Sequence, residues 1–110
     1  MSLNTKKTTV DGRSFSLTVR NFENGCLVFV SEGPERIGSM TVSLATGPAP
    51  VTTTIIPSKT ESLFLKMMAE RLSTRARGIA LVSVFVQGDL GNATAKALMS
   101  EIMEMVETHE

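Results

Sequence analysis

Apolar and polar residues alternate in short segments through the first half of the chain, as in β-strands with one face in water. Phe15, Leu17 and Val19 alternate with polar residues between Asp11-Gly12 and Asn24-Gly25. Both pairs favour tight hairpin turns, because their residues tolerate the positive φ angles that such turns need. Alternation also predicts a strand at residues 40–44, and the β-branched residues at 51–56 predict another. Residues 6–10 are the expected hairpin partner of the strand that contains Phe15.

Two segments are apolar at every or nearly every position, without alternation. They are Cys26–Val30 and Ile79–Val86, the second interrupted only by Ser83. A strand of this composition is expected where both faces of a sheet are shielded from water.

Helical spacing of apolar residues follows in two segments of the second half. The first helix is predicted to begin with a capping box formed by Ser58 and Glu61, and to end at Gly78 in the left-handed conformation. The second is predicted from about Asn92. Its outer face carries an acidic stripe, Glu101, Glu104 and Glu107.

These elements predict an α+β fold: an antiparallel sheet of about six strands, with the two main helices on one face. Two helices cover only one face of such a sheet. Leaving the apolar residues of the other face in water would forgo about 25 cal/mol of stabilisation for each Å² of apolar surface. We therefore expect the other face to pack in a dimer. The expected interface residues are Leu27, Phe29, Leu81 and Phe85. The alternative is a monomer with helices on both faces.

Composition narrows the classes of function. The 110 residues suit one domain spanning 1–110, and 11 basic residues balance 11 acidic ones. A neutral chain has no overall field to attract nucleic acid or an anionic membrane. The single Cys26 allows no internal disulfide, which fits a reducing cytoplasmic or nuclear compartment.

Residues suited to catalysis are scarce. His109 is the only histidine and lies one residue from the end of the given sequence, Cys26 lies in a strand, and Asp11 and Asp89 lie in turns. We therefore expect no enzyme activity, no metal and no cofactor. The segment Gly88–Gly91 between a strand and a helix is a weak candidate for phosphate binding, because it lacks the lysine of a P-loop.

Several stretches resemble one known family over nearly the whole chain. The sequence is similar to the proteasome assembly chaperone 3 family, although the loop at Gly47–Pro50 is shorter than in that family. The similar stretches are Leu27–Ser31, Gly38–Leu44, Val51–Ile56, Glu61–Phe64, Ala69–Leu72, Ala80–Val86 and the helix around Ala97-Leu98.

The resemblance implies a non-catalytic chaperone of the 20S proteasome. Such proteins form homodimers, or heterodimers with a related chaperone. They hold alpha-type subunits while the alpha ring assembles and leave before maturation. Two exposed polar loops and the acidic stripe are the expected client contacts: Glu32, Glu35, Arg36, Pro48, Glu101, Glu104 and Glu107. The alternatives are a dimeric adaptor in another complex, or a weak phosphate or nucleotide binder at Gly88–Gly91.

Overall fold

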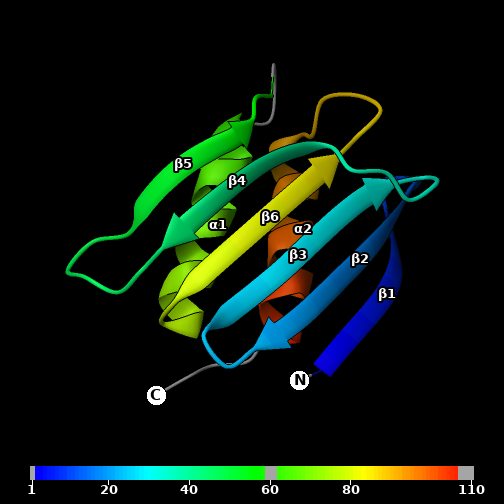
Figure 1. Cartoon of the computed structure of the whole chain (residues 1–110). Helices are drawn as coiled ribbons and strands as arrows, with labels where there is room; N and C mark the ends of the chain where they lie inside the picture. The colour runs from blue at the N-terminus through cyan, green and yellow to red at the C-terminus, as the bar shows by residue number, and fades with distance from the viewer. Residues whose placement is uncertain (1, 59–61, 107–110) are drawn as a thin grey trace.

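A computed structural model describes residues 2–58 and 62–106. Within them the chain forms a six-stranded sheet in the order β1-β2-β3-β6-β4-β5, with two helices on one side (Figure 1). The alternative with helices on both faces is therefore wrong for this part of the chain. The elements are β1 (Ser2–Val10), β2 (Arg13–Phe22), β3 (Gly25–Glu32), β4 (Ser39–Leu44), β5 (Val51–Ile56), α1 (Ser62–Ala76), β6 (Ile79–Phe85) and α2 (Asn92–Met105).

The sheet is mixed, whereas the sequence suggested an antiparallel one. The central strands β3 and β6 pair in parallel, with Leu27 opposite Leu81, and the other neighbouring strands are antiparallel. A parallel pair needs a long crossover between its strands. Here β4, β5 and α1 form that crossover and return the chain to the starting edge of β3.

The first hairpin turns where the sequence predicted, at Asp11 and Gly12, whose φ angles are 52° and 75°. The second turns one residue earlier than predicted, because Phe22 pairs with Gly25. Gly25 is therefore the first residue of β3. A Cβ there would collide with the backbone carbonyl of Ile79, so glycine permits the close start of the parallel pair.

The end of α1 differs from the prediction in one residue. Arg77, and not Gly78, adopts the left-handed conformation, with φ of 53°. The Gly78 N–H still closes the helix by donating to the Ser73 carbonyl at 3.1 Å. Gly78 lies against the carbonyl of Asn24, where a Cβ has no room. The predicted capping box includes Glu61, which lies outside the described residues.

The hydrophobic core lies between the sheet and the helices. Alternate residues of β2, β3 and β6 face α1 and α2 and are buried, and the intervening residues face away. The largest core side chains are Phe15, Leu17, Val28, Val30, Val82, Leu65, Met68, Leu72, Leu98 and Ile102. The prediction that β3 and β6 are apolar on both faces is confirmed. Their remaining large apolar residues, Leu27, Phe29, Leu81 and Phe85, lie on the face of the sheet away from the helices.

Candidate functional site

The side of the sheet away from the helices, here called the uncovered face, carries a broad apolar surface. At its centre are Leu27, Phe29, Leu81 and Phe85 of β3 and β6, all only partly buried. The surface continues onto the neighbouring strands β4 and β5 through Met40, Val42, Leu44 and Val51. Val51 is 68% exposed and Leu44 is 42% exposed. The four predicted interface residues are thus brought together, and the apolar area extends beyond them.

The orientation of β4 is the least expected feature of this face. Its polar residues Thr41 and Ser43 are buried toward the helices, while Val42 and Leu44 point to the uncovered face. An isolated monomer would favour the opposite arrangement, because apolar burial stabilises and polar burial requires hydrogen bonds.

Neighbouring hydroxyl groups satisfy Ser43 on the buried side of β4. The Ser43 Oγ lies 3.0 Å from Ser73 Oγ of α1 and 3.1 Å from Thr52 Oγ1 of β5. Thr52 Oγ1 also lies 3.0 Å from a carboxylate oxygen of Glu70. Val42 and Leu44 were not predicted as surface residues from the sequence. No signal in the sequence indicated this arrangement, because the helical spacing of polar residues assigns Ser73 to the solvated side of the helix, whereas the structure buries it.

The connection from β3 to β4, residues 33–38, lies against the uncovered face. The Arg36 guanidinium lies 5.3 Å from the centroid of the Phe85 ring. The Gly38 N–H donates to Ser83 Oγ at 3.0 Å, which satisfies a buried hydroxyl of β6. Glu35 and Ile37 are exposed beside it. This loop places two predicted client contacts, Glu35 and Arg36, at the border of the apolar surface.

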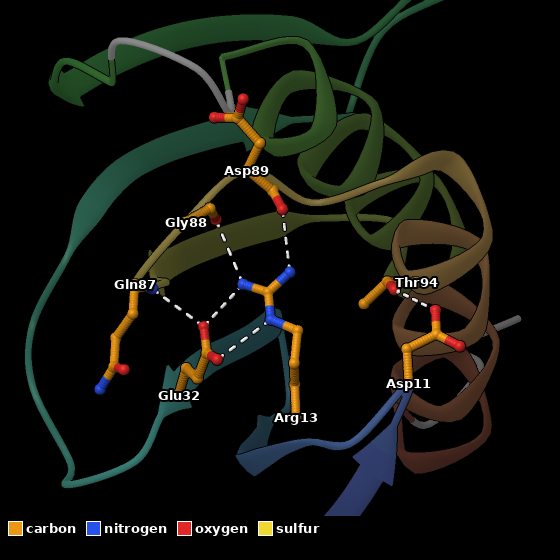
Figure 2. Close-up of polar contacts among 7 residues, drawn as sticks. All are labelled: Asp11, Arg13, Glu32, Gln87, Gly88, Asp89 and Thr94. Atoms are coloured by element: carbon orange, nitrogen blue, oxygen red, sulfur yellow. Dashed lines mark hydrogen bonds and ion pairs between the residues drawn. The ribbon is translucent and has the colours of Figure 1, made fainter.

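A polar cluster, the Arg13 cluster, joins the ends of three segments (Figure 2). Arg13 donates to both carboxylate oxygens of Glu32, at 2.7 and 3.0 Å, and to the carbonyls of Gly88 and Asp89 at 3.2 and 2.8 Å. The Gln87 N–H donates to Glu32 at 2.9 Å. The hydrogen bond from Arg13 holds the pKa of Glu32 below its usual value. Both oxygens of Glu32 are thus engaged within the chain.

The Arg13 cluster also bears on phosphate binding at Gly88–Gly91. Gly88 and Asp89 direct carbonyl oxygens at a guanidinium (Figure 2). A phosphate cradle instead needs backbone N–H groups aimed at the anion. The loop therefore presents acceptors to a cation, an arrangement that disfavours the nucleotide alternative.

The acidic stripe is divided between two environments. Glu101 forms an ion pair with Lys6 of β1, with 2.7 Å between Oε1 and Nζ, and the hydrogen bond from Lys6 lowers the pKa of Glu101. Glu104 is exposed, and Glu107 lies outside the described residues. Pro48 is exposed in the β4–β5 connection. The predicted client contacts therefore do not gather into one patch.

Groups suited to chemistry are few in the described ranges 2–58 and 62–106. No three His, Cys, Asp or Glu side chains there are arranged to hold a metal. Burial raises the pKa of the Cys26 thiol to about 11, so the thiol is neutral near pH 7. In the same ranges neither helix has the length and apolar character required to span a bilayer.

Comparisons with known proteins support the fold. No protein-family model matches the sequence, and no curated protein does. A solved structure described as "Crystal Structure of a Novel Chaperone Complex for Yeast 20S Proteasome Assembly" is similar to this chain, with a TM-score of 0.68 and 14% sequence identity. The alignment covers 96% of this chain and 99% of that chain. At this identity the likeness shows the fold, and in the fold it confirms the resemblance to a proteasome assembly chaperone.

Proposed function

We propose that this chain is a non-catalytic chaperone for assembly of the 20S proteasome alpha ring. It acts as a dimer whose subunits meet through the uncovered face, binds alpha-type subunits, and is released before maturation. The observation that carries the dimer is the orientation of β4, which turns Val42 and Leu44 away from the helices. The fold of the yeast chaperone complex gives independent support.

A dimer interface of standard size is compatible with the dimensions of the molecule. The molecule measures 38 × 28 × 22 Å along its principal axes. A standard interface buries about 800 Å² per subunit, roughly 500 Å² of it apolar. At about 25 cal/mol per Å² the two apolar surfaces contribute about 25 kcal/mol in total, against an association cost of roughly 4–15 kcal/mol plus side-chain ordering.

Sedimentation at micromolar concentration tests the dimer. The matched variants are Val42→Asp, on the uncovered face, and Thr46→Asp, in the exposed β4–β5 connection. We expect the wild type and Thr46→Asp to be dimers and Val42→Asp to be a folded monomer, with the folding checked by circular dichroism. A wild type that sediments as a monomer overturns the dimer.

The client is tested by tagging the chain in its own cells and identifying co-purified proteins by mass spectrometry. Alpha-type proteasome subunits are the expected result. Recovery of no proteasome subunit removes the assignment, and stoichiometric recovery of another complex by an intact dimer favours the general adaptor. A thermal-shift screen covers nucleotides, because a ligand at 100 times its Kd adds about 2.7 kcal/mol of stability.

Charge reversal tests the proposed polar client contacts. Glu35, Arg36, Pro48 and Glu104 are exposed, whereas Glu101 is paired with Lys6. Glu104→Lys is therefore the cleanest change to the acidic stripe. It should lower affinity for the captured subunit and weaken the dependence of that affinity on salt. Unchanged affinity would leave Glu104 as a solvated charge only.

A further inference from the structure

A groove of about 770 Å³ lies between α1 and α2, on the side of the molecule opposite the uncovered face. The two helices run in the same direction (Figure 1): Leu63 at the start of α1 shares the groove with Asn92 at the start of α2, and Arg75 near the end of α1 donates to the Val106 carbonyl. This surface, here called the helix groove, stays open in the proposed dimer.

The floor of the helix groove is apolar and rich in methionine. Its apolar lining includes Leu63, Phe64, Met67, Leu90, Met99 and Met103. Leu63 is 68% exposed and Met67 is 41% exposed. Unbranched methionine side chains adapt to the shape of a bound partner, which suits a docking surface.

The rim of the helix groove is basic, although the whole chain is neutral. Three cations line it, Arg71, Arg75 and Lys96, against one carboxylate, Glu104, which gives a net charge of +2. Arg75 donates to a backbone carbonyl at 3.1 Å. Within residues 2–58 and 62–106, Arg71 and Lys96 have no hydrogen-bond or ion-pair partner. Two cations therefore remain available to an acidic ligand.

The positions of these residues specify the shape of the ligand. Along α1, Leu63, Met67, Arg71 and Arg75 follow one another at steps of four, so one helix face is apolar and then basic. On the opposite wall Lys96 lies one turn into α2. An amphipathic helix places apolar anchors in such a groove at similar spacing. Acidic residues on its two flanks would meet cations on both walls.

Two other occupants fit less well. An anionic amphiphile needs cations gathered at one end for its headgroup, whereas these cations lie on both walls and at different heights along the groove. A second copy of the chain would bring an identical groove with the same net positive charge, which repels. We propose that the helix groove binds an acidic amphipathic helix of a partner protein. The inference does not depend on the proteasome assignment.

A designed peptide tests the proposal directly. The probe is a fluorescent helical peptide of about four turns, with leucine on one face and glutamate on both flanks. A control peptide carries lysine in place of every glutamate. The protein is labelled with ¹³C at its methionine methyl groups and studied by NMR. Met67, Met99 and Met103 report on the groove, Met40 on the uncovered face and Met68 on the core.

We expect the acidic peptide to shift the three groove methyl signals and to leave Met40 unchanged, and the lysine peptide to bind weakly. Arg71→Glu combined with Lys96→Glu should weaken the acidic peptide about tenfold, since two exposed attractions become repulsions. Lys66→Glu is the matched control, an exposed cation of α1 outside the groove, and should change affinity by less than about twofold. Melting temperatures confirm that each variant is folded.

Several outcomes overturn the proposal. Equal binding of the lysine peptide, or shifts at Met40 in place of the groove methyl signals, removes it. Shifts caused by decanoate but not by the acidic peptide would make the groove a site for an anionic amphiphile. Groove methyl signals that move when the protein is diluted in the absence of peptide would make the helix groove a contact between copies of the chain. Because alpha-subunit capture and dimer sedimentation are measured separately, failure of the proposed function is distinguishable from failure here.

Discussion

Replacing Arg13 with methionine should destabilise the protein by removing the centre of the Arg13 cluster. Arg13 donates four hydrogen bonds, two to Glu32 and two to carbonyls of the β6–α2 connection. Its side chain is 24% exposed and that of Glu32 is 12% exposed. A fully exposed ion pair contributes under about 1 kcal/mol and a single hydrogen bond to a charged group about 1.5–3 kcal/mol, so we expect a loss of about 2 kcal/mol.

The loss should depend on pH with a defined sign. The pKa of Glu32 is lowered in the folded protein, chiefly by the hydrogen bond from Arg13. Stability from a lowered carboxyl pKa is present above the pKa of the unfolded chain, about 4.3, and disappears as pH falls through the folded value. The gap between wild type and Arg13→Met should therefore be full at pH 7 and narrow below about pH 4.

Thermal unfolding followed by circular dichroism at several pH values measures this gap. About 2 kcal/mol corresponds to roughly 8 °C for a chain of this size. Lys7→Met, an exposed cation of β1, is the control and should change the melting temperature little. Glu101 also has a lowered pKa, so only the difference between proteins is informative. A difference below about 2 °C at pH 7, or one independent of pH, would refute the reasoning.

Three further predictions test other parts of the structure. Gly78→Ala should lower the free energy of unfolding in urea by more than about 3 kcal/mol, because the added Cβ collides with the Asn24 carbonyl. Gly47→Ala is the control and should be nearly neutral, because a Cβ there meets no neighbouring atom. Equal losses of stability for the two glycine variants would contradict the close approach of Gly78 to the Asn24 carbonyl. Ser73→Ala should cost about 1 kcal/mol by removing a hydroxyl partner of Ser43; no measurable loss would argue against the hydroxyl contacts. Cys26 should react with a disulfide reagent at pH 8 only as fast as the protein unfolds, because burial raises its thiol pKa to about 11; rapid labelling of the folded protein would be inconsistent with that burial.

The candidate interface was partly readable from the sequence. Leu27, Phe29, Leu81 and Phe85 stood out because they interrupt the polar positions expected on a wet strand face, and the structure places all four on the uncovered face. Their role in a dimer remains a prediction. Val42 and Leu44 could not be assigned to that face, because alternation shows that one side is apolar without showing which side meets the helices.

The helix groove and the Arg13 cluster could not be read from the sequence at all. Arg13 reaches Glu32 over 19 positions and the carbonyl of Asp89 over 76. Residues so far apart in sequence come together only when strands pair. The helix groove likewise depends on the separation of α1 and α2, which is set by where each helix packs against the sheet.

The sequence by itself determined the local elements: six strands, two helices, the first hairpin turn and the shortage of catalytic residues. It could do so because the period of apolar residues reflects the burial of each element within a few neighbouring positions. Only the tertiary structure decided the parallel pairing of β3 with β6, the side to which β4 turns its apolar residues, and the engagement of Glu32 by Arg13. Each of these depends on which distant segments become neighbours, and the pattern of a single segment carries no information about its neighbours.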